Sequence, residues 1–102
     1  MDYFEPFKER LTELCKAHHV SSLYAFGSAA RNELKADSDS DIDLLVELRP
    51  TDPHVWADHY WALEDQLAAL FDRPVDLISK RALRNKYFIA AVERTKVKLY
   101  EA

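Results

Sequence analysis

The feature that most constrains this chain is a lone glycine followed, further along, by two aspartates within a strand-like apolar pattern. Gly27 is the only glycine among 102 residues, and it directly follows the apolar run of residues 23–26. Asp41 and Asp43 stand where a second strand is expected to begin. Apolar residues alternate with them at Ile42, Leu44, Val46 and Leu48. Such alternation is typical of a strand with one buried face, so both carboxylates are expected to belong to an ordered strand.

The two aspartates are expected to point to the same side of that strand. Side chains two apart share a face, and the Cα atoms of Asp41 and Asp43 would lie about 6.6 Å apart. Two carboxylates on one side repel each other unless a cation lies between them, and Mg²⁺ suits such oxygen ligands. Gly27 permits a sharp turn that would leave Ser28 at the N-terminus of a brief helix, where unpaired N–H groups attract a phosphate. The stretch therefore predicts metal-assisted transfer from a nucleoside triphosphate.

The remaining chain alternates between helical and extended patterns. Helices are expected over 2–18, from Trp56 to Phe71 and over 85–95, and extended segments over 23–26, 75–78 and 97–100. Pro74 is expected to end the long helix, and Ser79 to cap a short basic helix that runs through Arg84. The expected fold class is α/β (α+β), with a small mixed β-sheet flanked by helices.

Asp76 is a carboxylate within an otherwise apolar strand, at residues 75–78. A charged group in such a place is costly unless it has a partner. Two interpretations follow from the residues alone. Asp76 could occupy an edge position and pair with a lysine or arginine, or it could be a third carboxylate beside Asp41 and Asp43.

The composition predicts one cytoplasmic domain. A chain of 102 residues suffices for one core, and the lone Cys15 excludes an intrachain disulfide. No apolar run approaches the roughly 18 residues that a membrane span needs, and the first residues do not form a signal-peptide pattern. The four histidines, His18, His19, His54 and His59, are expected at helix ends, in loops or on helix surfaces rather than as metal ligands.

The charge is unevenly distributed along the chain. The net charge of −4 argues against strong nucleic-acid binding, which depends on many contacts from lysine and arginine to phosphates. Residues 1–72 carry 6 basic and 15 acidic side chains, whereas residues 73–102 carry 8 basic and 3 acidic ones. The basic segment is interpreted first as a solvated helix face, and second as a surface for an acidic partner or a triphosphate.

These motifs resemble the signature of the polymerase-β-like nucleotidyltransferases. Gly27-Ser28 is followed, after twelve intervening residues, by Asp41-x-Asp43. The segments Phe26-Gly-Ser and Ser40-Asp-Ile-Asp-Leu44 are similar to the minimal branch of that family, the MNT proteins, many of which are antitoxins paired with HEPN toxins. Arg73-Pro-Val-Asp-Leu-Ile78 and Val97-Lys-Leu-Tyr100 also fit, so the resemblance implies one nucleotidyltransferase domain over residues 1–102.

The resemblance implies a metal-binding role for three carboxylates. Asp41 and Asp43 would bind two Mg²⁺ ions, and Asp76 would hold the second ion and accept the proton of an incoming hydroxyl. The resemblance thus favours the third-carboxylate interpretation of Asp76.

The resemblance also implies a nucleotide-binding role for the turn. Gly27 and Ser28 would hold the β- and γ-phosphates of ATP, and Arg31 would neutralise triphosphate charge. Asn32 stands where the family usually has glycine. Because asparagine tolerates a left-handed conformation, the fold is expected to survive this change, whereas its effect on activity is left open.

The function implied is transfer of AMP from ATP to a hydroxyl, favoured as a tyrosine, of a cognate HEPN toxin, with the chain acting as an antitoxin in a hetero-oligomer. The expected core elements leave no room for a separate acceptor domain, so another chain is expected to present the acceptor. Two alternatives stay open: a non-catalytic antitoxin that neutralises by binding alone, and a stand-alone transferase acting on a small molecule or an RNA end. The nucleotide preference, the number of AMP units, the acceptor residue and the stoichiometry are not fixed by the sequence.

Overall fold

The fold is built on a four-stranded sheet. The computed structural model describes residues 3–27, 30 and 41–102. The strands are β1 (Val20–Phe26), β2 (Ile42–Leu48), β3 (Val75–Ser79) and β4 (Val97–Glu101), in the spatial order β3-β2-β1-β4. β1 pairs antiparallel with both β2 and β4, while β2 and β3 are parallel, so the sheet is mixed as expected.

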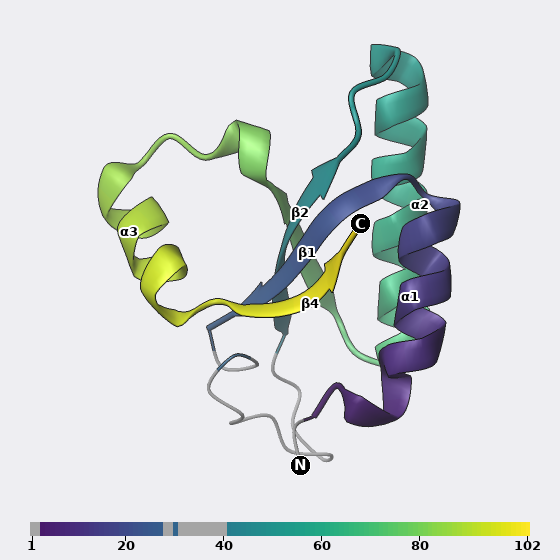
Figure 1. Cartoon of the computed structure of the whole chain (residues 1–102), viewed down its shortest axis with the longest axis horizontal. Helices are drawn as coiled ribbons and strands as arrows, with labels where there is room; N and C mark the ends of the chain where they lie inside the picture. The colour runs from purple at the N-terminus through teal and green to yellow at the C-terminus, as the bar shows by residue number, and fades with distance from the viewer. Residues whose placement is uncertain (1–2, 28–29, 31–40) are drawn as a thin grey trace.

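Helices cover both faces of this sheet, unequally. They are the 3-10 turn η1 (Glu5–Phe7), α1 (Lys8–Ala17), α2 (Pro53–Phe71), the 3-10 turn η2 (Lys80–Ala82) and α3 (Lys86–Thr95). Figure 1 shows α1 and α2 side by side against one face and α3 on the other. No helix in the described part of the chain has the length and apolar character needed to cross a membrane.

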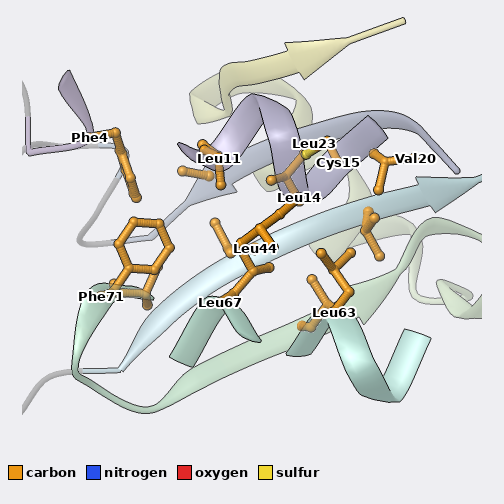
Figure 2. Packing of buried hydrophobic residues seen from close by; sticks show 14 of the residues in the cluster. Phe4, Leu11, Leu14, Cys15, Val20, Leu23, Leu44, Leu63, Leu67 and Phe71 are labelled. Carbon is orange, nitrogen blue, oxygen red and sulfur yellow. The ribbon is translucent and has the colours of Figure 1, made fainter. Parts of the chain in front are cut away.

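The main core lies between the sheet and the pair α1 and α2 (Figure 2). The sheet contributes the alternating apolar residues of β2, all of which are buried: Ile42, Leu44, Val46 and Leu48. The two helices contribute buried leucines at helical spacing: Leu11, Leu14, Leu63 and Leu67. Phe71 closes one end of this core, because its ring packs edge-on against Phe4 and Phe7 at centroid distances of 5.5 and 5.0 Å. The alternation in the sequence thus correctly predicted which face of β2 is buried.

The opposite face of the sheet has a smaller core under α3. Phe26, Leu45 and Val92 are buried there. Phe88 of α3 is partly exposed and meets Phe26 edge-on at 5.7 Å. Tyr87 beside it is 89 % exposed, so much of α3 faces solvent.

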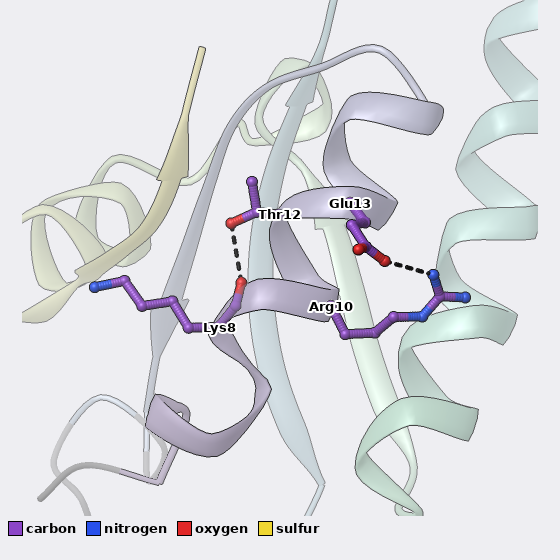
Figure 3. A network of polar contacts seen from close by, with 4 residues as sticks. All are labelled: Lys8, Arg10, Thr12 and Glu13. Carbon is purple, nitrogen blue, oxygen red and sulfur yellow. Dashed lines mark hydrogen bonds and ion pairs between the residues drawn. The ribbon is translucent and has the colours of Figure 1, made fainter.

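The outer side of α1 carries the local contacts expected of a solvent-facing helix (Figure 3). Arg10 and Glu13 form an ion pair at 3.0 Å, with both side chains 60 % exposed. The Thr12 hydroxyl donates to the carbonyl of Lys8 at 2.9 Å. An exposed ion pair of this kind contributes about 0.3–0.5 kcal/mol to stability. The stability of α1 therefore comes mainly from its buried leucines.

The elements form where the sequence predicted them, but several boundaries differ. The helix expected over 2–18 begins only at Lys8, after the turn η1, and α2 begins at Pro53, three residues before the expected start. Asp41 lies just before β2, so of the two aspartates only Asp43 belongs to the strand, which corrects the expectation for Asp41.

β1 begins at Val20, three residues before the expected strand. The expected helix capped by Ser79 is wrong: only the short turn η2 forms, without a side-chain cap from Ser79. Asn85 is the effective cap, because its side-chain oxygen accepts from the backbone N–H groups of Tyr87 and Phe88 at 2.9 and 3.0 Å and starts α3.

Candidate active site

Three segments that carry the predicted site residues meet at one end of the sheet. β1 ends at Phe26, and Phe26 pairs with Asp43 at the start of the antiparallel strand β2. Asp43 in turn pairs with Asp76 at the start of the parallel strand β3. The topology therefore places Gly27, Asp43 and Asp76 on neighbouring strands, although 49 positions separate the first from the last in the sequence.

Asp43 and Asp76 share the face of the sheet that α3 covers only partly. Side chains alternate along a strand, and Ile42 and Leu44 point into the main core, so Asp43 points to the opposite side. Asp76 lies on the same side, because Leu77 packs in the main core and Ile78 packs in the α3 core. Asp43 is half-buried, whereas Asp41 and Asp76 are exposed. Two of the three carboxylates are thus open to solvent.

Gly27 is required by its backbone conformation and by its contact with Asp43. Its φ of +67° lies in the left-handed region, where an L side chain is strained. A Cβ atom at this position would lie only 2.8 Å from the Oδ2 atom of Asp43. The Asp43 carboxylate therefore rests directly over the glycine backbone, which explains why the only glycine of the chain occurs at this turn.

The carboxylates interact electrostatically. Burial raises the pKa of Asp43 above its ordinary value, and the negative charges of Asp76 and Asp41 raise it further. Crowding of Asp41 and Asp43 was expected from their spacing, and the family resemblance favoured Asp76 as the third carboxylate beside them. The repulsion means that a cation bound among them would be favoured.

This pKa shift predicts how an Asp43→Asn variant responds to pH. Because the pKa of Asp43 is higher in the folded than in the unfolded state, folding favours the protonated carboxyl group. Its contribution to stability is complete below the ordinary pKa of 3.8 and is lost as pH rises through the folded-state pKa and the group ionises. We expect the variant to be at least as stable as wild type at pH 7, by about 1 kcal/mol or less because solvent screens the half-exposed carboxylate. The difference should shrink toward pH 3. Denaturant melts of both proteins between pH 3 and 7 measure it, and a variant clearly less stable at pH 7 would contradict the repulsion.

The donor set suits Mg²⁺, although it forms no closed cage. In the described parts of the chain, no three histidine, cysteine, aspartate or glutamate side chains already surround a common point. Mg²⁺ is usually held by one or two carboxylates plus substrate phosphates and water, rather than by an all-protein cage. Three neighbouring carboxylates on an open face, one with a raised pKa, fit that mode of binding.

Three of the residues discussed from the sequence lie outside the described part of the chain. These are Ser28, Arg31 and Asn32. The phosphate-binding roles expected of Ser28 and Arg31 therefore remain predictions, as do the brief helix after Gly27 and the effect of Asn32.

Two residues that the sequence did not single out support Asp76. β3 is an edge strand, and α2 covers its open edge with two side chains one helical turn apart. The Tyr60 hydroxyl donates to the carbonyl of Leu77, and the Leu77 N–H donates to Glu64 at 3.4 Å. Both hydrogen bonds hold the residue that follows Asp76. The i, i+4 spacing of Tyr60 and Glu64 was visible in the sequence, but their partner strand was not.

Comparison with known proteins identifies the family. The Nucleotidyltransferase domain family matches residues 7–99 of the chain. The chain belongs to this nucleotidyltransferase family. A Methanocaldococcus jannaschii protein named "Putative protein adenylyltransferase" is 39 % identical over 80 residues, which cover 78 % of this chain and 76 % of that protein.

Solved structures show the same nucleotidyltransferase fold. A protein named "putative minimal nucleotidyltransferase" superposes with a TM-score of 0.75 at 29 % identity, and the match covers 95 % of both chains. The MNT antitoxin complex of a tri-AMPylated Shewanella oneidensis HEPN toxin gives a TM-score of 0.62 at 22 % identity, covering 93 % of this chain and 70 % of the other. The second likeness shows the fold alone. The polymerase-β-like core expected from the sequence is therefore confirmed.

Proposed function

We propose that this nucleotidyltransferase moves AMP from ATP onto a hydroxyl, favoured as a tyrosine, of a cognate HEPN-type toxin, and so acts as an antitoxin. The observation that carries this proposal is the meeting of Asp43 and Asp76 on paired strand positions, with Asp43 resting over Gly27. In this proposal the chain works in the cytoplasm as one domain over residues 1–102, within a hetero-oligomer with its partner.

The carboxylates have distinct tasks in the proposed reaction. Asp41 and Asp43 would hold Mg²⁺ at the triphosphate, and Asp76 would share a second ion with them. When bound, Mg²⁺ supplies neutralisation of the phosphate charge that otherwise repels a nucleophile. Asp76 is exposed, so it is accessible to an acceptor hydroxyl and can take its proton.

The proposed reaction is a substitution at the α-phosphorus of ATP, in which one bond forms and one breaks. The acceptor oxygen forms a bond to the α-phosphorus of ATP, and the bond from that phosphorus to the oxygen bridging the β-phosphate breaks. Pyrophosphate leaves, the acceptor carries AMP, and the acceptor proton passes to the Asp76 carboxylate. Gly27 has no Cβ atom to crowd the Asp43 carboxylate, and the turn would let the backbone approach phosphates held beside that carboxylate.

The acceptor is proposed to come from another protein because the carboxylate face is open. Asp41 and Asp76 are exposed, and α3 covers this face mainly where its Val92 packs with Phe26 of β1 and Leu45 of β2. Support for a protein acceptor comes from the relatives: one carries the name of a protein adenylyltransferase, and another is an antitoxin solved with an AMPylated toxin. AMP placed near the active site of a ribonuclease toxin would block RNA by bulk and by negative charge.

The test is intact mass spectrometry of the neighbouring gene product after co-expression with this chain. We expect the partner to gain the mass of one or more AMP units with wild type. It should gain none with Asp43→Asn, and the full amount with Asp65→Asn, a matched change at an exposed carboxylate on α2. A partner that is neutralised yet carries no AMP would favour an antitoxin that acts by binding alone. AMP on a small molecule or an RNA end instead would favour the stand-alone transferase.

A further inference from the structure

Three histidines from separate elements meet at the end of the sheet opposite the carboxylates. His18 is the C-cap of α1, His19 precedes β1 with a positive φ of 59°, and His59 lies on α2. The His59 ring meets those of His18 and His19 edge-on, at centroid distances of 5.3 and 4.8 Å. From the sequence these histidines were expected to be unrelated helix-end and surface residues. The proposed transfer reaction uses none of them.

The two closest nitrogen atoms face each other. The Nδ1 atoms of His18 and His59 are 3.1 Å apart. In the absence of an ion, one ring must donate and the other accept a hydrogen bond. An ion placed at the usual 2.0–2.1 Å from both atoms would instead have an N–metal–N angle of about 100°, between the octahedral and tetrahedral angles. The spacing of the two nitrogen atoms therefore fits two ligands of one metal as well as it fits a hydrogen bond.

We propose that His18 and His59 form a two-histidine site for a divalent late transition-metal ion of the Ni²⁺, Cu²⁺ and Zn²⁺ class. Imidazole suits these ions and is a poor ligand for Mg²⁺, so the site differs in chemistry from the carboxylates. In the residues that the structure describes, no third histidine, cysteine or acidic side chain completes a ligand set. Water fills the remaining positions, and the affinity is correspondingly modest.

The surroundings hold the His18 ring ready to bind. His18 also has a side-chain hydrogen bond with Gln66, which restrains its ring. Burial is the largest influence on the pKa of His18 and lowers it, the hydrogen bond with Gln66 raises it, and His59 and His19 lower it by smaller amounts. The lowered pKa favours the neutral ring, whose lone pair a metal ion needs.

An ion bound at this site would cross-link two helices. His18 ends α1 and His59 lies on α2, so one ion would join the helices that cover the main core. The seven residues of β1 separate His19 from Gly27, a distance of about 26 Å along an extended strand. An ion bound only by the folded protein raises its apparent stability. This inference does not depend on the proposed transfer of AMP.

The test uses untagged protein and Ni²⁺ alone at pH 7.5, in millimolar Mg²⁺ so that carboxylate sites are occupied. Calorimetric titration should give one site in wild type, and Ni²⁺ should raise the melting temperature. His18→Asn and His59→Asn should each weaken binding at least about tenfold, whereas His54→Asn, which changes an exposed histidine outside the cluster, should leave it unchanged.

A spectroscopic readout keeps the test decisive if one variant folds poorly. With Cu²⁺ in place of Ni²⁺, the paramagnetic resonance spectrum should show splitting from two equivalent nitrogen ligands in wild type, and the signal should change in either variant. Wild type that binds no Ni²⁺, or binding that survives in His18→Asn and His59→Asn, would overturn the proposal and leave the pair as a hydrogen bond only.

Discussion

Asp43→Asn is expected to abolish AMP transfer in a protein that remains folded. Asp43 lies between Asp76, its register partner, and Gly27, over which its carboxylate rests. Removing one charged ligand from a metal-dependent phosphoryl site forfeits several kcal/mol of transition-state stabilisation, so transfer should fall by about 1,000-fold or more. Labelled AMP transfer and a thermal melt of the same sample measure both effects.

The control for this prediction is an exposed carboxylate far from the site in the sequence. Asp65→Asn on α2 removes the same charge from a surface position and should leave transfer unchanged. If Asp43→Asn keeps the wild-type rate, the assignment of this carboxylate to the reaction is wrong. If Asp65→Asn loses as much as Asp43→Asn, net charge rather than the site would explain the loss.

Gly27→Val is expected to damage both stability and nucleotide binding. A valine at a φ of +67° costs about 1–2 kcal/mol from backbone strain alone, and its Cβ atom would meet the Asp43 carboxylate at 2.8 Å. A loss of this size lowers the melting temperature of a small domain by roughly 4–8 °C per kcal/mol. ATP affinity should fall in parallel, because the side chain enters the space where the backbone would approach phosphate.

A double-mutant cycle separates the two causes. In an Asp43→Ala background the contact at 2.8 Å no longer exists, so Gly27→Ala should then cost only the backbone strain. Gly27→Ala in the wild-type background should cost more, by the free energy of displacing the carboxylate. Equal costs in the two backgrounds, measured by denaturant unfolding, would show that Gly27 and Asp43 are not coupled.

The elements that form the site could be predicted where the sequence pattern is local. The alternation through Ile42 and Leu44 fixed both the buried face of β2 and the opposite face that carries Asp43. Pro74 and the apolar run after it indicated a strand that begins close to Asp76. These patterns succeed because a strand places side chains on alternate faces whatever its partners are.

Long-range pairing could not be predicted in the same way. Nothing near β4 shows that it pairs with β1, or that α2 covers the free edge of β3 through Tyr60 and Glu64. The choice of Asn85 over Ser79 as a helix cap depends on where the chain leaves the sheet. The contact between His18 and His59 likewise depends on how α1 and α2 pack. Tertiary structure decides each of these, and local propensity does not.

The central claim is that this chain transfers an adenylyl group, and the position of the label in ATP tests it most directly. The purified partner is incubated with this chain and Mg²⁺, once with ATP labelled at the α-phosphate and once with ATP labelled at the γ-phosphate. The account predicts that label from the α-phosphate enters the partner and label from the γ-phosphate does not. It also predicts no transfer with Asp41→Asn, Asp43→Asn or Asp76→Asn. Label arriving from the γ-phosphate, or no label from either position while the partner is still bound and silenced, would contradict it.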